Sequence, residues 1–223
     1  MSVAMLTLAA QQGVDTVVAT PHFYWSKDET PASFLRDRQA AYDRLLPHLG
    51  EGLPQIKLGA EVLMREHISR LDLRPLCMED TDILLVEMPF SRPCHWLFAE
   101  LEEIAYTQRL TLMLAHLDRY MPWFKRQDLE QLLELPDVIV QLNAETIVDR
   151  RSFRALRKWL PDCPRLVLGS DMHNLGDRAP ETDKAIRVLS GNRTGRLWME
   201  QIDSTAAAIG DPDALSDKLE GWI

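Results

Sequence analysis

The chain has 223 residues, 46% hydrophobic and 26% charged, which is the balance of a globular protein with one sizeable core. Its formal net charge of −9 argues against nucleic-acid binding through a broad basic surface, because that mode needs clustered lysines and arginines. No run approaches the roughly 18 consecutive apolar residues of a membrane span, and no signal peptide is evident, so we expect a cytoplasmic protein.

Short runs rich in Val, Ile and Leu alternate with longer amphipathic stretches along nearly the whole chain. Strands are predicted at 15–20, 55–60, 82–88, 110–116, 137–142 and 165–170. Helices are predicted at 1–12, 32–49, 61–70, 96–108, 125–135, 146–160, 181–189 and about 196–209. Gly13 is expected to close the first helix and Pro31 to open the second. We expect one domain over 1–223, in which about 211–223 form an acidic C-terminal tail.

Residues capable of metal binding follow four of the predicted strands, at the carboxyl end of each. They are His22, Glu61, His116, Asp171 and His173. In a barrel of β/α units all these ends meet on one face, whereas an open doubly wound sheet brings together only some of them. The pattern therefore favours an α/β fold of the barrel type. A barrel unit starts with a strand and this chain starts with a helix, so the first strand is expected to be missing.

Imidazole and carboxylate side chains of this kind hold Mn, Zn or Fe. Glu61 can bridge two ions, and a two-metal site can clamp the attacking and leaving oxygens of a phosphoryl group. Asp171 and His173 are two residues apart, so on an extended segment they point the same way. Any one of the histidines alone is more often a hydrogen-bonded structural group, but the whole set at strand ends favours a metal site.

The three cysteines do not indicate a disulfide-stabilised fold, a zinc site or a cysteine-based phosphatase. Cys77, Cys94 and Cys163 are odd in number and widely spaced, which argues against a disulfide framework or a zinc knuckle. None of them is followed six positions later by Arg, so the loop of the cysteine-based phosphatases is absent. The glycine-rich nucleotide-binding motifs are absent too.

Sequence blocks along most of the chain resemble a known family. They are MSVAMLTLAAQQGVDTVVATPHFYW (1–25), GAE (59–61), LLVEMPF (84–90), AHLDRY (115–120) and GSDMHN (169–174). In this order they resemble the metal-dependent phosphoesterases of the polymerase-and-histidinol-phosphatase (PHP) type. LLVEMPF and AHLDRY further resemble the bacterial PHP tyrosine phosphatases that serve capsule and exopolysaccharide synthesis. The resemblance implies the PHP fold, a distorted (β/α)7 barrel.

The resemblance also implies roles for individual residues. Metal ligation falls to His22, Glu61 (bridging), His116, Asp171 and His173. Arg119 and Arg178 are implied to bind the substrate phosphate and to stabilise it during catalysis. A guanidinium group can bind a phosphate through two hydrogen bonds, which suits this role. For either arginine alone, a solvated surface charge is an equally good interpretation. Two or three divalent ions are implied for a complete site, with Mn first and Zn or Fe as alternatives.

The implied function is hydrolysis of phosphotyrosine on a bacterial tyrosine kinase of polysaccharide synthesis or export, by metal-activated water and without a covalent cysteine intermediate. Two alternatives stay open. One is a PHP phosphatase of a small phosphomonoester similar to histidinol phosphate. The other is a catalytically silent module that binds a phosphorylated kinase tail. The sequence leaves a homo-oligomer open.

The chain departs from the family pattern at its start. The family begins with a strand that ends in His-x-His, followed by an Asp-rich turn, and no His-x-His occurs in this sequence. Either the native protein extends upstream of Met1, or this is a shortened relative that binds fewer ions. We expect the first, because a barrel without its first strand exposes unpaired strand edges.

Overall fold

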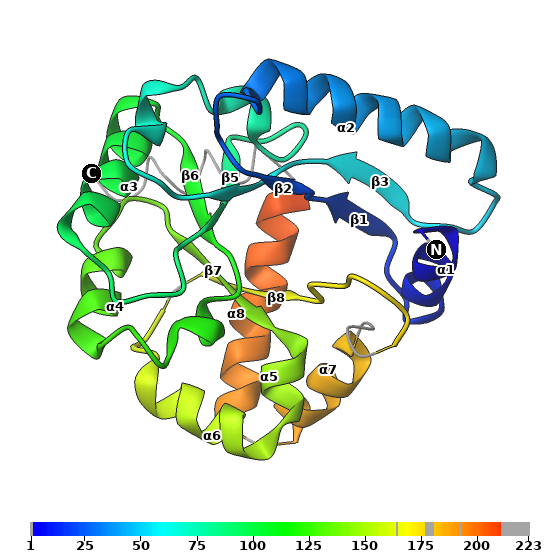
Figure 1. The fold of residues 1–223 in the computed structure, drawn as a ribbon. Coiled ribbons are helices and arrows are strands. Elements are labelled where there is room, and N and C mark those ends of the chain that lie inside the picture. Colours follow the sequence, from blue (N-terminus) through cyan, green and yellow to red (C-terminus); the bar gives the residue numbers. More distant parts are fainter. Residues whose placement is uncertain (1, 164, 177–180, 192, 211–223) are drawn as a thin grey trace.

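Parallel strands form the centre of the molecule (Figure 1). The computed structural model describes residues 2–163, 165–176, 181–191 and 193–210. In a two-stranded sheet, β1 (Thr16–Ala19) pairs with β3 (Gln55–Leu58). A six-stranded sheet has the order β2 (His22–Phe23), β4 (Glu61–Leu63), β5 (Ile83–Glu87), β6 (Thr111–Leu114), β7 (Ile139–Asn143) and β8 (Leu166–Gly169). Every strand pair in both sheets is parallel.

The two sheets are continuous with each other, because β1 and β2 are two parts of one extended segment and β3 and β4 are two parts of the next. Backbone hydrogen bonds bridge the interruption, from Gly59 N to Ala19 O at 2.9 Å and from Glu61 N to Pro21 O at 3.0 Å. Pro21 has no N–H to donate, which accounts for a break in the strand at that point. The described residues therefore form six strand positions, and these are the six that the apolar runs predict.

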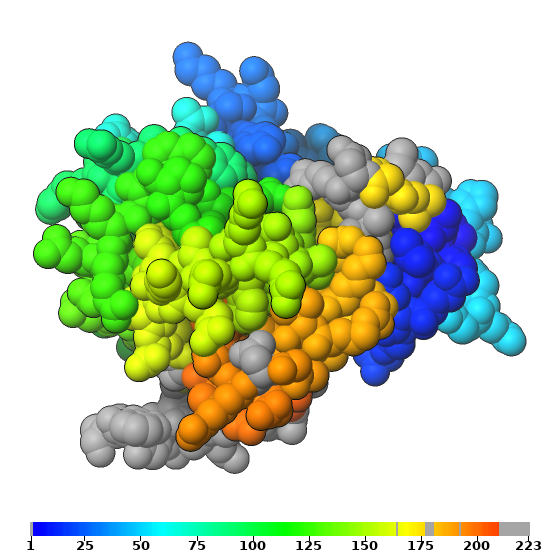
Figure 2. Space-filling model, turned by 90° about the horizontal axis from the view of Figure 1, so that it is seen from below, coloured from blue at the N-terminus to red at the C-terminus, as the bar shows by residue number. Residues whose placement is uncertain are grey.

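Most helices lie on the outside of the sheet, and the end of α8 (Arg193–Gly210) packs against the opposite face. The other described α-helices are α1 (Ser2–Gln11), α2 (Pro31–Leu45), α3 (His95–Thr107), α4 (Arg126–Leu133), α5 (Ala144–Val148), α6 (Arg150–Trp159) and α7 (Thr182–Ser190). Gly13 ends α1 with φ +82°, a left-handed conformation that glycine adopts without strain. Pro31 occupies the first turn of α2 behind a Thr30 capping box. Seen from below, α5, α7 and α8 lie side by side on the surface (Figure 2).

Two of the helix predictions are wrong. The stretch 61–70 is not helical: it contains β4, which is paired on both sides, and the 3-10 turn Ile68–Arg70. Sheet pairing outweighs the local helical pattern there, because β4 lies between β2 and β5. The stretch 146–160 is divided between α5 and α6 at Asp149. The Asp149 carboxylate accepts a hydrogen bond from Ser152 N at 2.7 Å and starts a new helix.

The core has two parts, one on each face of the sheet. On β5, Leu84 and Val86 point into the larger cluster beneath the helices, whereas Ile83 and Leu85 point to the other side. The second cluster consists of Met78, Ile83, Leu85, Met113, Ala115, Ile139 and Val167, and Ile209 near the end of α8 packs against it. Strands buried on both faces explain the continuous apolar runs in the sequence.

The sheet curls, as expected for a barrel-like fold. His22 on β2 and His173 after β8 come from the two edges of the strand order, yet their ring centroids are 6.1 Å apart. The α/β class with parallel strands is confirmed. Within the described residues, β8 pairs with β7 alone and no helix is long and apolar enough to cross a membrane. The predicted tail at 211–223 and Arg178 lie outside the described residues.

Candidate metal centre

Polar side chains gather at the neighbouring strands β2, β4, β5 and β6, where His22 and Glu61 are the first residues of β2 and β4 and follow the ends of β1 and β3 by three residues. His22 and Glu61 are directly opposite each other in the β2–β4 register. Glu87 is the last residue of β5, and His116 follows β6 by two residues. Because the carboxyl ends of parallel strands meet at one edge, residues far apart in sequence come together there.

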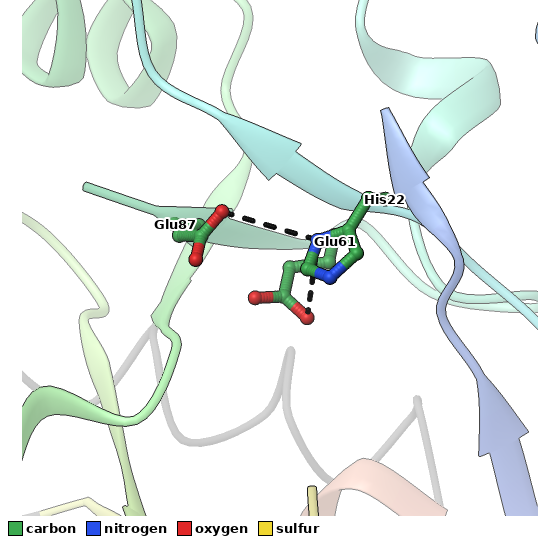
Figure 3. A group of neighbouring side chains, drawn as sticks. All are labelled: His22, Glu61 and Glu87. Atoms are coloured by element: carbon green, nitrogen blue, oxygen red, sulfur yellow. Dashed lines mark ion pairs between the residues drawn. The ribbon is translucent and has the colours of Figure 1, made fainter. Parts of the chain in front are cut away.

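The first three of these residues form a group with the spacing of metal ligands (Figure 3). One ligand atom from each of His22, Glu61 and Glu87 lies within 4.8 Å of the other two. The Nδ1 atom of His22 is 4.0 Å from Glu61 Oε2 and 3.9 Å from Glu87 Oε2. These distances are too long for hydrogen bonds. They suit two ligands of one ion, whose atoms lie roughly 3–4 Å apart when each metal–ligand bond is about 2.1 Å.

Charge and burial also favour a bound cation. Glu61 is 6% exposed and Glu87 8% exposed, and within the described part of the chain their ion pairs are with imidazoles rather than Lys or Arg. Two neighbouring buried carboxylates are unfavourable without positive charge. The buried Nδ1 of His22 also has no hydrogen-bond partner in the described residues. These side chains therefore fit a divalent metal such as Mn, Zn or Fe.

His116 is held against both carboxylates. Its Nε2 is 3.0 Å from Glu61 Oε1 and 3.5 Å from Glu87 Oε1. Burial lowers the pKa of His116, but the hydrogen bonds to the two carboxylates outweigh it and raise the pKa to about 9. The protonated imidazole therefore places positive charge next to the two carboxylates.

The backbone of His116 is positioned with some strain. Its φ of 33° is left-handed, a conformation that residues other than glycine rarely adopt and that is often found at functional sites. The His116 N–H donates to Gln141 Oε1 at 3.2 Å. The Gln141 side chain needs the space next to Gly169, where an added Cβ would come within 2.1 Å of Gln141 Nε2. Gly169 on β8 thus leaves room for the Gln141 side chain on β7, which holds the backbone of His116.

The other predicted site residues form an adjoining group. Asp171, which has a φ of 44°, forms an ion pair with Arg119, whose Nη2 lies 2.6 Å from Asp171 Oδ2. His173 Nδ1 lies 3.4 Å from Asp171 Oδ1, and its ring neighbours that of His22. Asn143, with its amide oxygen toward the guanidinium, accepts from Arg119 Nε at 3.1 Å and Nη2 at 3.2 Å. Asp171 thus faces an arginine, and the predicted ligands lie in two neighbouring groups.

Glu87 is the candidate ligand that the sequence analysis missed. Its signal is present in the sequence, because it is the one charged residue of β5 and stands at its carboxyl end. A carboxylate placed at the end of a fully buried strand needs a cation or a set of hydrogen bonds. The LLVEMPF block (84–90), which carries the family resemblance, contains Glu87.

Comparisons with known proteins agree on one family. The family model described as capsular polysaccharide synthesis, CpsB/CapC, matches residues 1–208. The tyrosine-protein phosphatase CpsB of Streptococcus pneumoniae is 23% identical over 201 residues, which cover 85% of this chain and 81% of that protein. A solved structure matches with a TM-score of 0.69 and 19% identity, over 89% of this chain and 83% of the other. It comes from the crystal structures of YwqE from Bacillus subtilis and CpsB from Streptococcus pneumoniae, described as unique metal-dependent tyrosine phosphatases.

Proposed function

This chain belongs to the CpsB/CapC family of capsular polysaccharide synthesis, and we propose that it is a metal-dependent protein-tyrosine phosphatase. The observation that carries the proposal is the convergence of His22 with Glu61 and Glu87, two buried carboxylates whose described ion partners are imidazoles. The relatives named as tyrosine phosphatases support the choice of substrate. The substrate that we propose is phosphotyrosine on a bacterial tyrosine kinase of polysaccharide synthesis or export, in the cytoplasm.

We assign metal binding to both groups of side chains. His22, Glu61, Glu87 and His116 would hold one ion, and Asp171 with His173 would contribute to a second beside it. A divalent cation supplies the Lewis acidity that activates water at neutral pH and offsets the charge of phosphoryl oxygens. Mn is our first choice because the carboxylates suit it, and Zn and Fe, which imidazole ligands suit, are the alternatives.

Arg119 is the residue that we propose to grip the substrate phosphate. Its side chain is 31% exposed, so a ligand can reach it, and Asn143 and Asp171 orient its guanidinium. The turn that carries Arg119 is itself fixed, because Asp118 accepts from Asn143 N at 2.8 Å and from Thr146 Oγ1 at 2.6 Å. An oriented guanidinium loses little freedom when it binds a phosphate bidentately. Arg178 remains the second proposed phosphate-binding residue.

The cysteines support a mechanism without a thiolate nucleophile. Burial raises the pKa of Cys77 to about 12 and that of Cys163 to about 11. Cysteine-based phosphatases need the thiolate at neutral pH, and therefore a lowered pKa. Neither of these two buried thiols can serve that purpose.

The test is release of phosphate from a phosphotyrosine peptide by the purified chain, with Mn, Zn or Fe added in turn and bound metal measured in the same samples. We expect turnover with at least one metal and loss of most of it in Glu61→Gln. Glu103→Gln, an exposed carboxylate on α3, is the matched control and should behave as wild type. A metal-loaded protein that releases no phosphate from the peptide would sink the proposal.

Two further measurements separate the alternatives. Faster turnover of histidinol phosphate than of the phosphotyrosine peptide would replace the proposal with a small-molecule phosphatase. Binding of the phosphopeptide with less than about one metal ion per chain and no turnover would instead indicate a silent binding module.

A further inference from the structure

Two exposed aromatic side chains lie against two of the imidazoles of the metal centre, those of His22 and His116. Tyr24 is 45% exposed and stacks on His22, with ring centroids 5.2 Å apart and planes at 14°. Phe90 is also 45% exposed and stacks on His116 at 5.7 Å and 15°. Large exposed apolar side chains beside a polar site are a common mark of a ligand-binding surface.

Phe90 packs against the rings of Tyr120 and Trp123, which are not among the proposed metal ligands. Its ring lies 5.1 Å from that of Tyr120 with planes at 9°, and 5.7 Å from that of Trp123. The Tyr120 hydroxyl donates to Met88 O at 2.7 Å and accepts from Met88 N at 2.9 Å, which fixes the chain two residues before Phe90. Phe90 is thus covered on one side, while much of its ring stays open to solvent in a fixed position.

Tyr24 is fixed by its backbone in a similar way. Its N–H donates to Glu29 Oε2 at 2.8 Å. The Ser26 hydroxyl closes the turn between them by accepting from Asp28 N at 3.2 Å and Glu29 N at 3.0 Å. Local hydrogen bonds therefore fix the backbone next to both rings. The rings stay exposed, although burying their apolar surface would stabilise the protein more.

We propose that Phe90 and Tyr24 bind the aromatic ring of an aryl phosphate whose phosphate group reaches the metal centre, and that they set a preference for aryl over alkyl phosphoesters. This inference rests on the proposed phosphatase function. A phosphate held between the proposed metal ions and Arg119 would leave its substituent on the side of the site where Phe90 and Tyr24 are exposed. A phenyl ring gains offset-stacked or edge contacts with them, whereas the side chain of a phosphoserine has no aromatic face to offer.

The experiment compares kcat/KM for a phosphotyrosine peptide with that for a phosphoserine peptide of the same sequence. Binding of phenylphosphonate against methylphosphonate gives the same comparison without turnover. In Phe90→Ala and Tyr24→Ala we expect the aryl-to-alkyl ratio to fall by about tenfold, which is the scale of an aromatic contact. Phe90→Tyr should keep the ratio. Tyr106→Ala, which removes an aromatic ring that is 62% exposed on α3, is the control and should leave the ratio unchanged.

An unchanged ratio in Phe90→Ala and Tyr24→Ala would overturn the inference while leaving the phosphatase function intact. Equal losses for both phosphoesters, at unchanged metal content, would also overturn it, because they would indicate a general structural role. A wild-type protein without phosphotyrosine turnover would refute the proposed function instead, and the phosphonate comparison would still decide the aryl site. If Phe90→Ala fails to fold, Phe90→Leu keeps the apolar bulk and should still lower the ratio.

Discussion

Replacing Glu87 by glutamine removes one carboxylate from the proposed metal site and keeps the shape of the side chain. The side chain is 10% exposed, and its Oε1 lies 3.5 Å from His116 Nε2. Without metal we expect the stability to change by no more than about 1 kcal/mol, because Glu61 still balances the His116 charge at 3.0 Å. For a chain of this size that is a shift in Tm of about 2–4 °C in either direction.

With metal the two proteins should differ clearly. At a metal concentration about 100 times its Kd, the wild type gains roughly 2.7 kcal/mol, or about 5–11 °C in Tm. Loss of a carboxylate ligand should weaken binding by at least about 100-fold, since even outer groups of metal sites contribute tenfold to 100-fold. The same concentration then equals the variant's Kd, and the gain falls to about 0.4 kcal/mol, or about 1–2 °C.

Thermal unfolding of wild type, Glu87→Gln and the control Glu103→Gln, each with and without Mn, measures this difference. The metal content of each protein is determined in parallel. Glu103→Gln should show the full gain in Tm, because its side chain is exposed on α3. An equal gain in Glu87→Gln and the wild type would refute the assignment of Glu87 as a ligand.

Three further predictions concern the supports of the site and the thiols. Tyr120→Phe should lower the free energy of unfolding, measured by urea denaturation, by about 1–3 kcal/mol, because the N–H and C=O of Met88 lose their hydrogen-bond partner. The control Tyr106→Phe, at an exposed position, should change it little. Glu100 accepts from Ser69 N and His67 N, and these bonds lower its pKa despite the opposing effect of burial. The difference in unfolding free energy between wild type and Glu100→Gln should therefore have its full size at pH 7 and shrink as the pH falls through the folded-state pKa of Glu100. Chemical unfolding at pH 7 and pH 3 measures this difference, and the same value at both pH values would contradict the prediction. In native protein at pH 8 a thiol reagent should label the exposed Cys94 rapidly and leave Cys77 and Cys163 unmodified, whereas all three react in denaturant; rapid native labelling of all three would contradict the buried positions.

The apolar runs predicted the strands because parallel strands buried on both faces leave a clear signal. All five residues of β5 are buried, and the prediction at 82–88 is close to its observed range. The helical prediction at 61–70 failed because Glu61 takes part in the sheet, where pairing with β2 and β5 outweighs the local pattern. Local sequence contains no information on that pairing.

The sequence by itself determined which residue types stand at the strand ends. His22, Glu61 and His116 could be placed together because the carboxyl ends of parallel strands share one edge. Only the tertiary structure showed that Glu87 joins them and that Asp171 faces Arg119. The parallel pairing of β4 with β5 places Glu87 beside the group. The curl of the sheet decides the contact of Asp171 with Arg119, because it sets how closely the end of β8 approaches the turn after β6, and no spacing along the chain specifies that approach.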